Sequence, residues 1–218
     1  AISGFGNVGW GVVKKTAELG GKVVAIAGPD GYIYDPDGAV TDEKINYLLE
    51  MRASGRDKVQ DYADKFGCEF HAGEKPWGLG ADKVDIMMPC ATQNDVNMDS
   101  AKKIAASGIK YYIEVANMPT TNDALEFLKE QKHMVIAPSK AVNACGVAVS
   151  ALEMAQNAER LYWTAEEVDA KMHQIMANIY HSSVAAAERY GLGYDLVAGA
   201  NIVGFQRVAD AMMAQGIF

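Results

Sequence analysis

The chain has 218 residues, half of them hydrophobic, which is enough for one substantial core. With a formal net charge of −8, most of the surface would repel a polyanion, so we expect no nucleic-acid partner. No apolar run reaches the roughly 18 residues of a membrane span, and no charged leader precedes a short apolar core, so we expect no membrane segment and no secretory signal. The cysteines have neither disulfide nor metal-ligand spacing, which favours a reducing, cytoplasmic compartment and no metal site; they are Cys68, Cys90 and Cys145.

The first predicted elements surround a glycine pattern, Gly4-x-Gly6-x-x-Gly9. A strand stub at residues 1–3 precedes it, a helix at about 8–19 follows, and a second strand covers 22–27. Gly4 allows a sharp turn, Gly6 lets the backbone approach a pyrophosphate, and Gly9 lets the helix pack on the sheet. The N–H groups at the helix start would then face phosphate oxygens. Because the chain begins almost inside a strand, we also expect residues upstream of Ala1.

Strands and helices alternate along the first part of the chain. We predict further strands at about 32–34, 69–71, 84–88, 111–115 and 134–137, and helices at about 41–53, 56–66, 99–107 and 122–131. From Val142 on, only helices are predicted, at about 146–159, 164–190 and 202–214. This order is typical of an α/β fold with a doubly wound, mostly parallel, Rossmann-like sheet, followed by C-terminal helices. We expect one dinucleotide-binding domain over 1–218, with a sheet-and-helix part at about 1–140 and a helical part at about 141–218.

Ligands of such sheets bind at the carboxyl ends of the strands, where the strand order reverses. This rule selects five loops, at residues 4–9, 28–31, 89–95, 116–121 and 138–146. Side-chain amides at Gln93, Asn117 and Asn143 offer both a donor and an acceptor, which suits a nicotinamide carboxamide. The same residue types also form turns and cap helices, so this alternative stays open.

The end of the second strand favours NAD over NADP. An acidic residue there usually binds the ribose 2′-hydroxyl, and Asp30 lies close to that position. No Lys or Arg lies between Lys22 and Lys44, so we expect a 2′-phosphate to meet Asp30, Asp35 and Asp37 without a local cation. A nucleophilic role for Cys90 or Cys145 is a weaker alternative, since no histidine lies next to either.

Several segments closely resemble the C-terminal, cofactor-binding domain of bacterial hexameric glutamate dehydrogenases of the NAD-preferring type. These segments are residues 3–8, 28–35, 88–94, 114–120, 137–143 and 198–205. The resemblance covers essentially the whole chain. It implies NAD as cofactor, oxidation of L-glutamate to 2-oxoglutarate and ammonium by hydride transfer, and a homo-hexameric parent protein.

The resemblance also implies roles for individual residues. The pyrophosphate loop would comprise Gly4, Phe5, Gly6, Asn7 and Val8. Pro29 and Asp30 would lie at the adenosine ribose; Ala91, Thr92 and Asn117 along the nicotinamide riboside; and Asn143 near the carboxamide. Val147 and Ser150, one helical turn apart, would reach the side-chain carboxylate of the substrate. Cys145 departs from the family pattern, which usually has Gly there.

The family's catalytic lysine and aspartate belong to an N-terminal substrate domain that is absent from this sequence. We therefore expect no catalytic residue in this chain, and cofactor binding without turnover. Two alternatives remain, a domain of a related leucine, phenylalanine or valine dehydrogenase and a stand-alone, non-catalytic NAD-binding module. The Ser150 hydroxyl argues against an apolar substrate side chain, because burying it unpaired would cost about 1–3 kcal/mol.

Overall fold

The computed structural model describes residues 1–216; residues 217–218, the end of the range expected for the domain, lie outside the described residues. The chain divides into two compact units, Ala1–Met134 and a second unit that begins at Val135. Each unit is described separately below.

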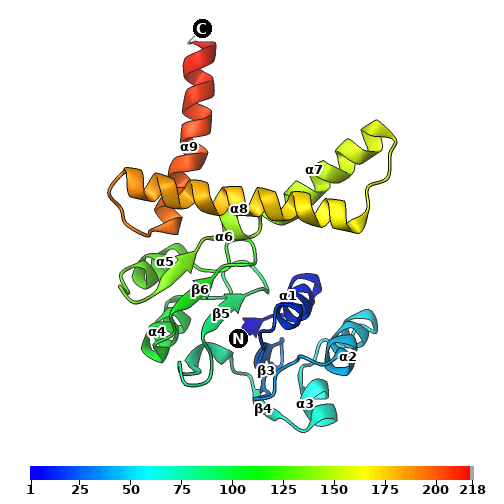
Figure 1. Ribbon diagram of the computed structural model, residues 1–218. Coiled ribbons are helices and arrows are strands. Elements are labelled where there is room, and N and C mark those ends of the chain that lie inside the picture. Colours follow the sequence, from blue (N-terminus) through cyan, green and yellow to red (C-terminus); the bar gives the residue numbers. More distant parts are fainter. Residues whose placement is uncertain (217–218) are drawn as a thin grey trace. The chain divides into compact units, whose positions relative to one another are not determined.

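The first unit contains six strands of a mixed sheet (Figure 1). They are β1 (Ile2–Ser3), β2 (Ala25–Ala27), β3 (Gly31–Tyr34), β4 (Glu69–Ala72), β5 (Ile86–Pro89) and β6 (Tyr111–Ile113), in the spatial order β4-β3-β2-β1-β5-β6. Four of them, β2, β1, β5 and β6, pair in parallel, which confirms the predicted α/β architecture. The chain first moves outward from β1 through β2 to β4 and then continues at β5 on the other side of β1. The switch point of the strand order therefore lies between β1 and β5.

The edge formed by β3 and β4 is antiparallel. Only Gly28, Pro29 and Asp30 separate β2 from β3, and a parallel connection needs a crossover of a dozen or more residues. The short turn therefore forces β3 to reverse direction.

Helices cover both faces of this sheet. The first unit contains α1 (Asn7–Glu18), α2 (Asp42–Ala53), α3 (Gln60–Phe66), the 3₁₀ turn η1 (Pro76–Gly78), α4 (Met98–Ser107) and α5 (Asn122–Lys129). The crossovers through α1 and α4 leave the centre of the sheet in opposite directions, and right-handed crossovers then put these two helices on opposite faces. Helix α2 packs beside α1, and α5 beside α4, as Figure 1 shows.

The apolar core of this unit lies between the sheet and α1–α3, and it encloses one charged cluster. Asp35 is 4% exposed and accepts hydrogen bonds from the Lys44 ammonium at 2.6 Å and the Tyr62 hydroxyl at 3.0 Å. Burial, together with the neighbouring carboxylate of Asp35, raises the pKa of Tyr62. Through these hydrogen bonds, Asp35 in the turn after β3 is linked to Lys44 of α2 and Tyr62 of α3.

The second unit contains β7 (Val135–Ala137) and the helices α6 (Ser139–Val142), α7 (Ala144–Glu159), α8 (Ala165–Arg189) and α9 (Leu196–Gln215). Thr164 and Glu167 form the predicted capping box at the start of α8. Helices α8 and α9 pack closely, since a Cβ on Gly199 would overlap the carbonyl oxygen of Ser183. The remainder of α9 exposes apolar side chains, including Phe205, Val208, Met212 and Met213.

Two predicted helix boundaries are wrong. Helix α3 begins at Gln60 instead of about 56, because the Asp30 carboxylate accepts hydrogen bonds from the N–H groups of Val59 and Gln60 and so sets the start of the helix. Helix α9 begins at Leu196 instead of 202, because the Asp195 side chain caps it by accepting from the Ala198 N–H. The short helix α6 was not predicted.

Candidate functional site

The glycine-rich turn lies at the switch point of the strand order. Gly4 has a φ of 80°, and a Cβ on this residue would come within 2.9 Å of the Cα of Ala91 in the loop after β5. A Cβ on Gly9 would overlap the carbonyl oxygen of Gly4, whereas one on Gly6 would meet nothing within 4 Å. The first and third glycines therefore allow close packing of backbone segments, and the second leaves its backbone open to a ligand.

The start of α1 is free of capping side chains. Gly6 is its N-cap residue, no side chain caps the helix, and its first turn has no acidic residue. The N–H groups of this turn thus have no intrahelical carbonyl and no capping side chain, and the helix dipole adds positive potential there. This arrangement suits a phosphate group.

A pocket of about 450 Å³ opens beside this turn. It lies within the first unit, between the carboxyl ends of β2 and β5 and the segment that follows α2. Its lining residues are Gly4, Phe5, Gly6, Ala27, Gly28, Pro29, Arg52, Gly55, Arg56, Asp57, Lys75, Ala91, Thr92 and Asp95. The volume and the phosphate-facing helix start are suited to a nucleotide.

Six of the residues assigned to the cofactor from the sequence line this pocket together: Gly4, Phe5, Gly6, Pro29, Ala91 and Thr92. Asn7 and Val8 form the adjoining first turn of α1, and Asn117 is exposed in the loop after β6. Asn143, Val147 and Ser150 belong to the second unit, where Val147 is 72% exposed and the Ser150 hydroxyl donates to the carbonyl of Gly146.

Three cations in the pocket were missed by the sequence analysis, namely Arg52, Arg56 and Lys75. The expectation of no local cation considered only residues 22–44, whereas the fold brings these side chains in from the end of α2 and from the loop after β4. Arg56 contacts Glu50 at 3.2 Å, and the Lys75 ammonium lies 3.4 Å from a carboxylate oxygen of Asp95. The signal available in the sequence was a pair of arginines four residues apart, Arg52 at the end of one predicted helix and Arg56 at the start of the next.

Two of the acidic residues expected to face a 2′-phosphate have other contacts. Asp35 is in the buried cluster with Lys44 and Tyr62. Both carboxylate oxygens of Asp30 accept backbone N–H groups of α3 and its N-cap, and Asp30 does not line the pocket. Repulsion by Asp35 is therefore excluded as a reason for discrimination against a 2′-phosphate.

The cysteines give no support to nucleophilic chemistry at this site. All three are free thiols, and Cys90 is 5% exposed. Burial raises the pKa of the Cys90 thiol to about 12, so this sulfur stays protonated near neutral pH. Among residues 1–216, no group of three or more His, Cys, Asp or Glu side chains is arranged to hold a metal ion.

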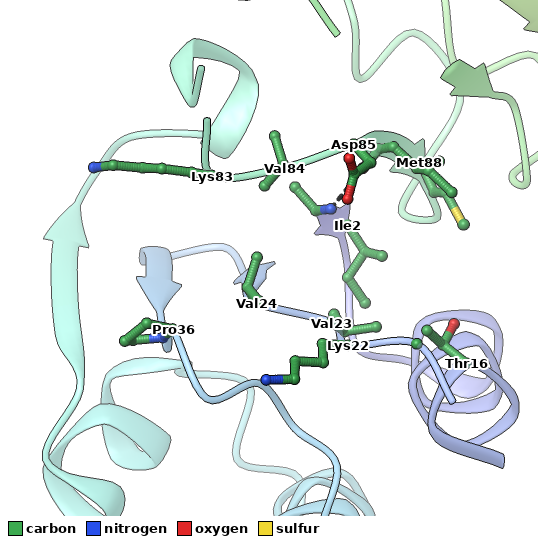
Figure 2. A pocket seen from close by; sticks show the side chains of 13 residues that line it. Ile2, Thr16, Lys22, Val23, Val24, Pro36, Lys83, Val84, Asp85 and Met88 are labelled. Atoms are coloured by element: carbon green, nitrogen blue, oxygen red, sulfur yellow. Dashed lines mark hydrogen bonds between the residues drawn. The ribbon is translucent and has the colours of Figure 1, made fainter. Parts of the chain in front are cut away.

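A second cavity, of about 400 Å³, lies by the amino ends of β1, β2 and β5, at the ends of these strands opposite to the glycine-rich turn. Figure 2 shows Lys22, Lys83 and Asp85 around it, together with apolar side chains such as Val24 and Val84. It contains no glycine-rich turn, and ligands of open parallel sheets bind at the carboxyl ends of strands. The pocket at the glycine-rich turn is therefore the candidate functional site.

A glycine-rich turn at the switch point of a largely parallel sheet, beside a pocket of nucleotide size, defines a dinucleotide-binding α/β protein. Comparison with known proteins gives the family. The family model described as Glutamate/Leucine/Phenylalanine/Valine dehydrogenase matches residues 1–216, and the chain belongs to this family.

Relatives with known activities match all of this chain. The NAD-specific glutamate dehydrogenase of Clostridium symbiosum is 72% identical over 217 residues, and the NADP-specific glutamate dehydrogenase of Escherichia coli is 47% identical over 219. A solved structure of a glutamate dehydrogenase, 72% identical, superposes on 99% of the chain with a TM-score of 0.95. The chain spans about half the length of these proteins, 48% and 47% of the two relatives and 47% of the solved chain.

None of the helices described between residues 1 and 216 has the length and apolar character needed to cross a membrane.

Proposed function

We propose that this chain binds NAD at the pocket beside the glycine-rich turn, as the cofactor-binding part of a glutamate dehydrogenase. The observation that carries the proposal is the convergence of the open Gly6 backbone, the uncapped start of α1 and a pocket of about 450 Å³ at the strand switch point. The relative that is 72% identical is NAD-specific, and the one that is 47% identical is NADP-specific, which favours NAD.

The binding residues that we propose are those assigned from the sequence. Gly4 to Val8 hold the pyrophosphate through backbone N–H groups, and Pro29 and Asp30 form the turn at the adenosine. The nicotinamide half involves Ala91, Thr92, Asn117 and Asn143, and Val147 and Ser150 face the substrate side chain. NAD supplies the hydride acceptor for L-glutamate oxidation, while the catalytic lysine and aspartate are contributed by the other half of the full-length enzyme.

The full-length enzyme is proposed to be a homo-hexamer that works in the cytoplasm. The free thiols of Cys68, Cys90 and Cys145 are compatible with a reducing compartment. Exposed apolar side chains on α9 fit a chain whose remaining half would cover them.

Calorimetric titration of the chain with NAD and NADP tests the proposal. NAD is expected to bind, NADP to bind more weakly, and L-glutamate to produce no absorbance from reduced nicotinamide. Gly6→Asp places a carboxylate where the phosphates would lie, and it should abolish NAD binding. Gly11→Asp is the matched control, since a Cβ at Gly11 also meets nothing within 4 Å but lies further along α1, outside the pocket.

Equal NAD binding by the two variants would contradict the proposed pocket. Glutamate-dependent reduction by this chain alone would contradict the assignment of catalysis to the other half. Among the family's substrates, glutamate is favoured by the name of the 72% identical relative and by the polar Ser150. A screen of the full-length enzyme with glutamate, leucine, phenylalanine and valine distinguishes these substrates.

A further inference from the structure

The contacts of Asp30 differ from those of a side chain that binds a ligand directly. Its two carboxylate oxygens accept the N–H groups of Val59 at 2.9 Å and Gln60 at 3.1 Å. Its carbonyl oxygen accepts the N–H of Gly73 at 2.8 Å. Asp30 thus connects the turn after β2 to the N-terminal end of α3 and to the loop after β4, while its neighbour Pro29 lines the pocket.

Both segments held by Asp30 lead into the pocket wall. Gly55, Arg56 and Asp57 line the pocket, and only Lys58 separates them from the two residues whose N–H groups Asp30 accepts. Lys75 lines the pocket two residues after Gly73. Without the carboxylate, the segment between α2 and α3 would lose the two hydrogen bonds that hold its C-terminal end, at Val59 and Gln60.

From these contacts we propose that Asp30 is a positioning residue, which raises cofactor affinity by holding the segment 55–60 against the pocket and makes no hydrogen bond to the adenosine ribose. This inference rests on the proposed NAD binding, and it specifies how Asp30 contributes to that site. A carboxylate that already accepts two backbone N–H groups has its charge partly compensated, which makes it a poorer acceptor for a ribose hydroxyl.

The test compares NAD with its analogue that carries 2′-deoxyadenosine, on the wild-type chain and on Asp30→Ala. If Asp30 acts by positioning, the variant binds both ligands roughly tenfold more weakly, the scale expected for a lost charged hydrogen bond, and the ratio of the two dissociation constants stays at its wild-type value. Amide hydrogen exchange at Val59 and Gln60 should accelerate in the same variant. A ratio that falls toward one in Asp30→Ala would show a direct contact with the 2′-hydroxyl and overturn the inference.

Two further variants separate positioning from general loss of stability. Asp195→Ala removes another aspartate cap, at α9, and should lower the unfolding midpoint without weakening NAD binding. Asp30→Asn keeps one acceptor oxygen and should give an intermediate NAD affinity and an intermediate rate of amide hydrogen exchange at Val59 and Gln60. This variant also tests the inference if Asp30→Ala does not fold. NAD affinity unchanged in Asp30→Asn would overturn the inference while leaving NAD binding intact. A wild-type chain that binds no NAD would overturn the proposed function, and this inference with it.

Discussion

The backbone N–H of Asn94 donates a hydrogen bond to the carbonyl oxygen of Met118 at 3.0 Å, and both residues have positive φ, 58° and 45°. The contact joins the loops that follow β5 and β6, and Val96 and Thr120 extend it as a β-bridge. Left-handed backbone is costly for residues other than glycine, and Met tolerates it less well than Asn. The two loops thus hold each other in a strained conformation next to the pocket.

Replacing Met118 by glycine should relieve this strain. The side chain is 58% exposed, so little packing is lost, and the free energy of unfolding should stay level or rise by about 1 kcal/mol. Urea denaturation of Met118→Gly measures the change. Leu19→Gly is the control, because Leu19 is also exposed but has a φ of −86°, so glycine there should only destabilise. Equal losses in both variants would show that Met118 stores no strain.

Two glycines of α1 should respond in opposite ways to the same substitution. Gly9→Ala would force a Cβ onto the carbonyl oxygen of Gly4 and should destabilise the chain by about 2 kcal/mol or more. Gly11→Ala meets nothing within 4 Å and should stabilise it by about 0.5–1 kcal/mol, because alanine favours helix. Urea denaturation of both variants checks the pair, and similar effects would contradict the close packing of α1 on the turn.

The buried charged cluster should show strong coupling. Lys44→Met leaves Asp35 charged and without its ion-pair partner, and should cost about 3–5 kcal/mol of stability. Adding Asp35→Asn removes the unpaired charge and should recover part of that loss. A double-mutant cycle by urea denaturation measures the coupling energy, and strict additivity would mean that the pair contributes nothing.

Local sequence patterns predicted most of the fold because they depend on neighbouring residues. The glycine spacing, the strand–helix alternation and the capping box at Thr164 are such patterns, and all are present. The antiparallel edge was also readable, since the turn at 28–30 is too short for a crossover.

Contacts between residues that are distant in the chain could not be predicted from local sequence patterns. The cap that starts α3 comes from Asp30, 29 residues before Val59 in the chain. The pocket cations come from two separate parts of the sequence, Arg52 and Arg56 around the end of α2 and Lys75 after β4. Only the folded chain brings them beside the glycine-rich turn. Their position depends on how α2 and β4 pack, which residue-by-residue propensities do not describe.

The pocket's positive charge and its phosphate loop are therefore encoded in different parts of the chain. Arg52 and Arg56 stand at the end of α2 and in the segment after it, outside the strands whose packing builds the core. Substitutions there can change the electrostatic preference of the site while the strand ends that shape it stay the same. Within this architecture, nucleotide selectivity is free to diverge without a new scaffold.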